Sequence, residues 1–478
     1  MHCREASVGG AGGCGVVKGL CTTLAVCAWL FTGCTGDERP NVVLVILDTT
    51  RADHFSAYGY PRATTPGFDA FAERAILFER AFATSSWTVP SHASLFTGLY
   101  PMTHGATQES QYLSEEAETL AELLAADGYE TAAFSNNAWV GEKTNLTQGF
   151  GYVGEMWRER GHGQAMRTNR AVMEWLDARD RDRPFFLFVN YIEPHWTYSA
   201  PRAWQDRFLG PGVTPAQRKR ANFGVVDWYL DRSRVPDGLL PIRTALYDAE
   251  LAWVDSALGE LLELLRNRGL EDSSLVVVAS DHGENLGDND HQGHSFALYD
   301  STLRIPLAIR PPGGGGAGSL RRDPVQLTDV FHTIASAAGV APGDTRSVGE
   351  DLLAGPLPDE RPVVAEYYYP AQFLSYFPEP AREGPGLAPF RRRIRSLRVG
   401  PHKFIWGSDG RHELYDVEAD PGETRDLAAS APAVAGRMQE ALEILVERYG
   451  ADTAPPAPRD GVLDPETEAT LRELGYLR

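Results

Sequence analysis

The sequence predicts a doubly wound α/β fold with a mostly parallel sheet, and three observations carry this prediction. Continuous apolar runs rich in β-branched residues are typical of strands that are buried on both faces. Amphipathic stretches separate these runs and predict helices between them. Strands that alternate with helices form a parallel sheet with helices on both faces. The chain has 478 residues, which is enough for one large core and a smaller one.

The predicted strands are short and strongly apolar. The run NVVLVIL at 41–47 is the clearest of them. The other predicted strands occupy 130–134, 184–191, 274–280 and 304–309. Helices are predicted at 118–127, 168–179 and 242–268, and a further helix near 325–338. In the longest of these helices, Leu251, Val254 and Leu258 recur at helical spacing.

The C-terminal part differs in texture and predicts a small antiparallel sheet with a covering helix. Short strands are expected at 394–399, 403–406 and 413–415, and a helix at 432–449. The glycine-rich run at 311–316 is expected to be a loop. We therefore expect a main α/β domain at 41–355 and a C-terminal subdomain at 356–478.

The charge balance and the cysteine positions limit the classes of function. The chain has 45 Lys and Arg residues against 65 Asp and Glu residues, a net charge of −20 at pH 7. Proteins that bind nucleic acid normally carry the opposite sign, so we expect no nucleic-acid partner. All 5 cysteines lie between Cys3 and Cys34. The body of the chain therefore has no disulfide and no cysteine metal site.

The N-terminal segment predicts export. An apolar stretch at 20–31 follows Lys18 and is short for a membrane span but suitable for a signal-peptide core. It ends in LFTGC, which resembles a bacterial lipobox. This interpretation gives a signal peptide at 1–33, lipid-modified Cys34 as the mature N-terminus and a tether at 34–40. The protein would then be held at a membrane of the cell envelope through its lipid, facing the periplasm or the exterior. A plain signal peptide or an uncleaved anchor is the alternative.

Candidate polar residues follow three of the predicted strands. Asp48 comes directly after the first strand, His195 comes shortly after the third, and Asp281 and His282 follow the fourth. In an open α/β sheet, ligands bind beyond the carboxyl ends of the strands. We therefore expect these four residues to form one site.

The segment SWTVPSHASLFTG at 86–98 resembles the nucleophile motif of the sulfatases, in which C/S-x-P-S/A-R precedes a helix and T-G-x-Y-P. By this resemblance Thr88 stands where the family has the Cys or Ser that is oxidised to formylglycine, and His92 stands where it has Arg. Threonine cannot become an aldehyde, because its Cβ already carries a methyl group. Threonine nucleophiles occur instead in phosphoryl-transferring relatives of the alkaline phosphatase superfamily, such as lipoteichoic acid synthases and phosphoethanolamine transferases.

Two further segments resemble the metal loops of that family. Asp48 and Thr49 stand where the family usually has Asp-Asp, and the motif SDHGE, which contains Asp281 and His282, matches the second loop. The resemblance implies that Asp48, Asp281, His282 and the Thr88 oxygen bind a divalent metal ion. Oxygen ligands with one imidazole suit Mn²⁺, Mg²⁺, Ca²⁺ or Zn²⁺ and do not choose among them. Asp48 alone is equally well a helix cap or a loop acid.

Thr88 is predicted to begin a helix, with Pro90 at an early helical position. As a nucleophile, Thr88 would be activated by the metal, and the helix N-terminus would attract an anion. The alternative is that Thr88 caps the helix, and the two roles are compatible.

The remaining catalytic candidates are histidines and one arginine. His195 lies in a segment that resembles the family's P-H-x-P, whose His contacts the ester oxygen or leaving group. His294 falls where relatives have a Lys or His that binds the transferred anion. The motif has an Arg at the position of His92. His92 and Arg51 are the candidates that would supply the positive charge of this Arg. Each lone histidine is alternatively an ordinary surface residue, and His291 stays open.

Three functions remain open at this point. The resemblance spans about 41–427 and includes ELYDVEADPGE at 413–423, so we interpret 41–355 as a sulfatase-like catalytic domain. The favoured function is a metal-dependent hydrolase or transferase that acts on phosphate esters through Thr88. The alternatives are a sulfatase without formylglycine and a catalytically silent binding protein of the envelope. The substrate would be an ester with an anionic phosphoryl or sulfuryl group, and 203–240 is expected to form a pocket wall or lid.

Overall fold

The structure is a computed structural model that describes residues 9–13, 15, 39–158 and 164–450. The chain divides into two units, Met1–Glu38 and Arg39–Arg478, and the description below concerns the second. Cys34, most of the expected signal peptide and residues 451–478 lie outside the described residues. The domain boundary at 355 stays a prediction. In the described part of the chain, no helix combines the length and the apolar character needed to cross a membrane.

An eight-stranded sheet forms the centre of the molecule, with the order β12-β2-β11-β7-β1-β6-β4-β5. From β7 to β5 all neighbouring strands are parallel, and only β11 runs against its neighbours. The predicted mostly parallel sheet is therefore confirmed. The strand bounds are β1 Asn41–Leu47, β2 Ile76–Phe78, β4 Glu130–Ser135, β5 Tyr152–Glu155, β6 Phe185–Tyr191, β7 Ser274–Ala279, β11 Leu307–Arg310 and β12 Ser319–Arg321.

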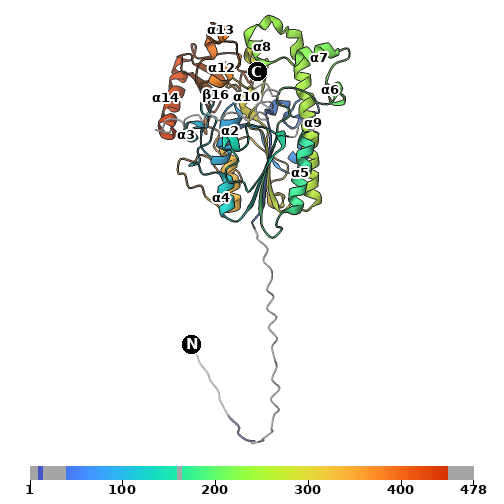
Figure 1. Cartoon of the computed structure of the whole chain (residues 1–478). Coiled ribbons are helices and arrows are strands. Elements are labelled where there is room, and N and C mark those ends of the chain that lie inside the picture. The colour runs from blue at the N-terminus through green and yellow to red at the C-terminus, as the bar shows by residue number, and fades with distance from the viewer. Residues whose placement is uncertain (1–8, 14, 16–38, 159–163, 451–478) are drawn as a thin grey trace, which may run out of the picture. The chain divides into compact units, whose positions relative to one another are not determined.

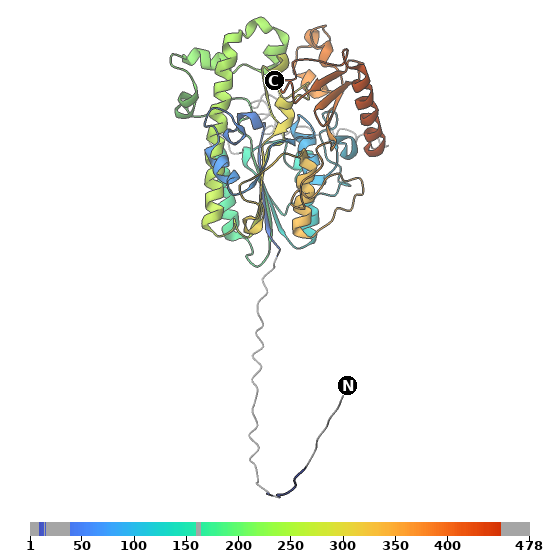
Figure 2. The same cartoon turned by 180° about the vertical axis from the view of Figure 1, so that it is seen from behind.

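Helices cover both faces of this sheet, as Figures 1 and 2 show from opposite sides. One layer contains α2 (Thr88–Thr97), α4 (Leu120–Ala126) and α11 (Leu327–Ala338), and the other contains α1 (Pro66–Ala72), α5 (Gln164–Ala178) and α9 (Leu240–Asn267). Alternate residues of β1 enter different cores: Val42, Leu44 and Ile46 one, and Val43, Val45 and Leu47 the other. This explains why the run is continuously apolar.

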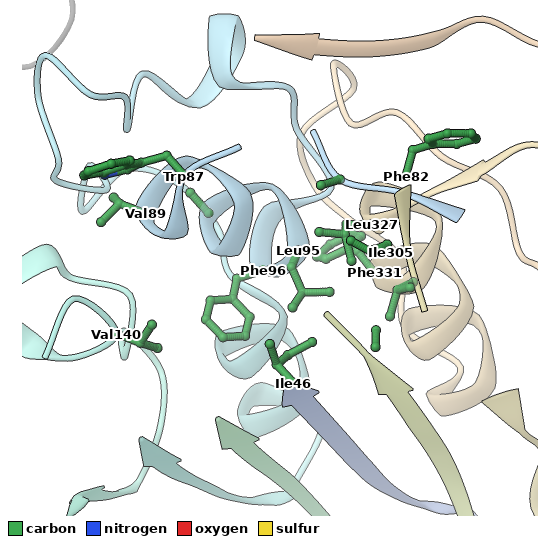
Figure 3. Packing of buried hydrophobic residues seen from close by; sticks show 14 of the residues in the cluster. Ile46, Phe82, Trp87, Val89, Leu95, Phe96, Val140, Ile305, Leu327 and Phe331 are labelled. Atoms are coloured by element: carbon green, nitrogen blue, oxygen red, sulfur yellow. The ribbon is translucent and has the colours of Figure 1, made fainter. Parts of the chain in front are cut away.

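The core on the α2 side fixes this helix against the sheet. In Figure 3, Leu95 and Phe96 of α2 lie close to Ile46 of β1, and Leu327 and Phe331 of α11 lie beside Leu95. All five side chains are almost fully buried. The helix α2 is therefore held in place against β1 and α11.

The apolar run at 304–309 was predicted as one strand, and this is wrong. It forms two strands in two different sheets, β10 (Arg304–Ile305) and β11 (Leu307–Arg310). β10 pairs with β3 (Ala81–Phe82), whereas β11 pairs with β7 and β2. Pro306 lies between them, and a proline has no backbone N–H for continuous pairing.

The C-terminal part forms the expected small antiparallel sheet with a helix. The strand order is β14-β15-β16-β17, and every pair is antiparallel. The bounds are β14 Val363–Tyr367, β15 Ile394–Val399, β16 His402–Gly407, β17 Glu413–Asp416 and α14 Pro432–Tyr449. Met438 and Leu442 of α14 pack in one cluster with Leu397 and Phe404 of the sheet.

Short elements connect these layers. The segment between β6 and α9 contains α6 (Arg202–Phe208), α7 (Pro215–Ala221) and α8 (Val225–Leu230). The others are β13 Val325–Gln326, which pairs with β3, the hairpin β8 Asn285–Leu286 and β9 Gln292–Gly293, and the helices α3 Pro101–His104, α10 Asp300–Leu303, α12 Ala371–Ser375 and α13 Glu379–Arg382.

Candidate active site

The site lies where β1, β6 and β7 end. β1 lies between the other two strands, and Ile46 pairs with both Asn190 and Ala279. Because the three strands are parallel, the residues that follow them meet at one edge of the sheet. Asp48 and Asp281 follow β1 and β7 within two residues.

Asp48, Asp281 and His282 form a compact buried group. One ligand atom of each lies within 4.8 Å of the others, and it is the one such group of three in the described part of the chain. The Asp281 Oδ2 and His282 Nε2 atoms are 3.4 Å apart. The Nδ1 atom of His282 lies 3.0 Å from the Gly283 carbonyl, so Nδ1 carries the proton and Nε2 has a lone pair. The geometry suits one small cation.

The electrostatics of this group also fit a cation. Asp48 Oδ1 and Asp281 Oδ2 are buried without a hydrogen-bond partner. Burial raises the pKa of Asp281 to about 7, and burial together with the neighbouring Asp281 raises the pKa of Asp48 well above its usual value. Two buried carboxylates repel each other unless a positive charge lies between them. The two orphaned oxygens and the imidazole nitrogen therefore fit a divalent metal ion.

Several groups orient the two carboxylates. The Asn137 side chain donates to Asp48 Oδ2 at 2.7 Å. The backbone N–H groups of Thr49 and His282 donate to Asp281 Oδ1 at 3.1 and 2.8 Å. Sequence reasoning missed Asn137, although it follows β4 just as Asp48 follows β1. The rule that ligands bind beyond the carboxyl ends of the strands, which predicted Asp48, therefore also applies to Asn137.

Thr88 is the first residue of α2 and is buried. Its Oγ1 atom lies 3.4 Å from His282 Nε2. The helix has Trp87 as its N-cap residue, and no side-chain hydrogen bond caps it. The structure therefore does not give Thr88 the role of a side-chain cap, and the hydroxyl lies beside the metal-binding group.

His92 lies one turn further along α2. Its Nδ1 atom is 2.9 Å from the Thr88 carbonyl and 3.5 Å from Asp281 Oδ2. Burial lowers the pKa of His92 to about 3, so its imidazole is neutral at pH 7. The structure thus brings His92 to the site, but as a neutral group rather than as the charge that an arginine would supply there.

His195 and His294 lie side by side. Their ring centroids are 5.1 Å apart, and the His294 ring is 4.7 Å from that of His282. Burial, and next the neighbouring His294, lower the pKa of His195 to about 3, and burial lowers the pKa of His294 well below its usual value. The Glu284 carboxylate approaches His294 to 3.6 Å. Both rings are therefore neutral at pH 7 before an anion arrives.

Arg51 and His291 point elsewhere. The Arg51 guanidinium forms ion pairs with the carboxylates of Asp53, at 2.8 Å, and Asp288, at 2.6 Å. It is therefore directed to these two acids and not to Thr88. The His291 ring packs against Tyr299 and Phe390. Arg51 as a source of charge for the substrate stays a prediction.

The fold and the site together define a hydrolase of the alkaline phosphatase superfamily, a class of enzymes with an acid- and histidine-lined site at the end of a parallel sheet. The Sulfatase family model matches residues 40–340, and this chain belongs to that family. Members of the family depend on a divalent metal ion, in agreement with the group formed by Asp48, Asp281 and His282.

Relatives with different substrates resemble the chain to a similar degree. The ulvan-active sulfatase of Formosa agariphila is 25% identical over 429 residues, which cover 81% of this chain and 77% of the relative. The multifunctional alkaline phosphatase superfamily protein PehA of Trinickia caryophylli is 24% identical and covers 84% of this chain and 93% of its own. The phosphonate monoester hydrolase of Agrobacterium radiobacter superposes with a TM-score of 0.68 at 24% identity, over 86% of this chain and 96% of its own.

Proposed function

We propose that this chain is a metal-dependent phosphoester hydrolase or phosphotransferase in which Thr88 stands at the formylglycine position and acts as the nucleophile. The observation that carries the proposal is the 3.4 Å distance between Thr88 Oγ1 and His282 Nε2. It places a hydroxyl at a buried group of two carboxylates and an imidazole. A divalent cation held by this group would stabilise the Thr88 alkoxide.

The chain's own residues supply the rest of the reaction. The Thr88 oxygen attacks phosphorus, its proton leaves to solvent, and the bond from phosphorus to the ester oxygen breaks. An anionic ester beside His195 and His294 raises their pKa, so that one of them takes up a proton and donates it to the departing oxygen. Water or an acceptor alcohol then attacks the phospho-threonine and releases Thr88. The N-terminus of α2 adds a favourable dipole for the anion.

A sulfatase without formylglycine is the second candidate, because sulfatases are among the relatives of this chain. After sulfuryl transfer, however, a simple threonine ester lacks the second hydroxyl with which a formylglycine hydrate expels sulfate. A phospho-threonine is open to attack by a nearby water. This difference favours a phosphorus ester over a sulfate ester as the substrate. A silent binding protein is the third candidate, and the retained group of Asp48, Asp281, His282 and Thr88 argues against it.

A comparison of matched substrates tests the proposal. The purified protein, loaded in turn with Mn²⁺, Mg²⁺, Ca²⁺ and Zn²⁺, is assayed with 4-nitrophenyl phosphate, the corresponding diester, the phosphonate monoester and the sulfate. We expect kcat/KM for the best phosphorus ester to exceed that for the sulfate at least about tenfold, or roughly 1.4 kcal/mol. A trapped phosphopeptide containing Thr88 would support the covalent route. A reproducible preference for the sulfate would contradict the proposal and favour the second candidate.

A further inference from the structure

The segment at 221–230, which runs from the last residue of α7 to the end of α8, contacts both loops that carry the histidines of the site. The loop after β6 contains His195 and Tyr198, and the hairpin of β8 and β9 leads into His294. The segment lies close to the N-terminal part of α9, at the end of the molecule where α7 and α8 are labelled in Figure 1. No residue of this segment belongs to the site described above, so its contacts need an explanation.

Asn222 binds one residue of the His195 loop at two points. Its Oδ1 atom accepts the Tyr198 N–H at 3.1 Å, and its Nδ2 atom donates to the Tyr198 carbonyl at 2.7 Å. Both backbone groups of Tyr198, three residues after His195, are thus satisfied by a single side chain. The loop cannot shift without breaking two hydrogen bonds, each of which contributes to its order.

Arg243 of α9 fixes the backbone on either side of Asn222. Its Nη1 atom donates to the carbonyls of Ala221 and Phe223 at 3.3 and 2.9 Å. Its guanidinium also packs over the ring of Tyr198, 5.1 Å from the centroid. Arg243 is fully buried. Asn222 therefore projects from a backbone that the longest helix of the α/β core holds in place.

Tyr229 makes the equivalent contact with the other loop. Its hydroxyl donates to the Gln292 carbonyl at 3.2 Å and accepts the Gln292 N–H at 3.2 Å. Gln292 is two residues before His294. The Tyr229 ring is held edge-on against Phe296 and Phe390, with centroids 5.2 and 4.9 Å away. One short segment thus binds both backbone groups of one residue in each loop.

We propose that Asn222 and Tyr229 are positioning residues that set the places of His195 and His294. The inference rests on the proposed function, in which these two histidines act on the ester. The histidine rings touch each other across the site, but they come from loops that are far apart in the chain. A displacement of about 1 Å in a reacting group costs up to about a hundredfold in rate. The segment at 221–230 links the two loops and thereby fixes the distance between the rings.

Double-mutant cycles test this inference on the full mature chain with bound metal. Asn222→Ala is combined with His195→Ala, and Tyr229→Phe with His294→Ala. We expect each of Asn222→Ala and Tyr229→Phe to lower kcat/KM about tenfold when the histidine is present, and less than about twofold when it is absent. If a residue acts through the histidine, its substitution no longer changes kcat/KM once the histidine is removed. Metal content and the melting temperature are measured for every variant.

Two further variants separate positioning from stability. Tyr58→Phe is the matched control, because the Tyr58 hydroxyl also bonds to both the carbonyl and the N–H of one residue, Leu307, which lies outside the histidine loops. It should lower the melting temperature to a similar extent and leave kcat/KM within about twofold. Asn222→Asp retains the acceptor for Tyr198 N–H and loses the donor, so its activity should fall between those of the native protein and the alanine variant.

The outcomes distinguish the inference from the function on which it rests. If Asn222→Ala and Tyr229→Phe lower kcat/KM equally with and without the histidine, the positioning role is overturned and the proposed function is not. Native activity in Asn222→Ala and Tyr229→Phe would have the same consequence. Native activity in both His195→Ala and His294→Ala would overturn the proposed roles of the histidines, and the inference with them.

Discussion

Thr88 Oγ1 lies 3.4 Å from Nε2 of His282, although 194 positions of the chain separate the two residues. The contact joins the start of α2 to the end of β7, and it depends on the packing of α2 against β1 and α11. The Thr88 hydroxyl therefore lies beside the imidazole of the metal-binding group.

Thr88→Ala should lower kcat at least about 10³-fold, because the proposed nucleophile is lost while the metal-binding group remains. Thr88→Ser should retain measurable turnover, since it keeps the hydroxyl. Steady-state kinetics with the best phosphorus ester measure both effects. Thr97→Ala, at the other end of α2, is the control and should leave kcat within about threefold. Turnover of Thr88→Ala at the native rate would remove Thr88 from the mechanism.

Asp281→Asn and His282→Ala should each strip the metal. Changes around a metal site typically cost about 10–100-fold in affinity or activity, and the loss of a direct ligand should cost more. Elemental analysis after dialysis measures the occupancy. Asp290→Asn removes an exposed carboxylate from the nearby hairpin and should leave the occupancy unchanged. Full occupancy in both ligand variants would refute the assignment.

Thr49→Asp should tighten metal binding. Thr49 has φ of 55°, a left-handed conformation that is rare for a β-branched residue and better tolerated by Asp or Asn. An aspartate here would add a second carboxylate after Asp48, as in the usual family pattern. We expect about tenfold tighter binding, because affinity grows with the number of charged ligands. Isothermal titration of the metal-free protein measures it, with Thr49→Asn as the uncharged control; equal affinities of the two variants would contradict the prediction.

Stability should fall as the pH rises from about 4 to about 7, in part because of Asp255. Its carboxylate accepts the N–H groups of Gly67 and Phe68 at the start of α1, at 2.7 and 2.8 Å. Burial raises its pKa to about 7 from a usual 3.8. A raised pKa favours the folded state below pH 4, and this contribution disappears as the pH passes 7. Three pKa units correspond to at most about 4 kcal/mol.

Asp255→Asn is the variant that measures the contribution of Asp255 to the pH dependence of stability. It cannot titrate, so its free energy of unfolding should depend less steeply on pH between 4 and 7 than that of the native protein. Urea denaturation across this pH range provides the comparison. Parallel pH profiles of the two proteins would exclude Asp255 as the source.

The mature protein should begin at Cys34 and carry lipid there. The proposal follows from the apolar segment that ends in LFTGC. Mass spectrometry of the envelope fraction should detect a diacylglyceryl N-terminal peptide, and Cys34→Ser should release the protein from the membrane. A dominant unmodified peptide spanning Gly33 to Thr35 would contradict the lipobox interpretation.

The sequence was sufficient to predict the strands that are buried on both faces, because burial removes polar residues from the whole run. β1, β4, β6 and β7 are of this kind, and the ends of β1 and β7 led directly to Asp48 and Asp281. The three-residue strands β2 and β12 were missed, since so short a run carries no period. The run at 304–309 misled because apolar character does not reveal which sheet a strand joins.

The directions of side chains were harder to predict than their positions. Arg51 is close to Asp48 in sequence, but its guanidinium donates hydrogen bonds to the carboxylates of Asp53 and Asp288. Asp288 is 237 residues away, so no local pattern indicates the pair. Tyr229 lies in the segment 203–240 that was expected to form a pocket wall or lid, but its contact with Gln292 was missed, and so was that of Asn222 with Tyr198, because these partners are backbone groups of distant loops.

The place of β1 between β6 and β7 has a consequence for insertions and deletions. One extra residue inside Asn41–Leu47 would move the following carboxylate by about 3.3 Å and exchange the faces on which the valines and leucines lie. Core packing and metal binding would then fail together. Length changes compatible with function should therefore fall outside this strand, for example in the turn at Pro312–Gly314, whose residues pack against neither core. A library of single-residue insertions, selected for turnover, would reveal this contrast directly.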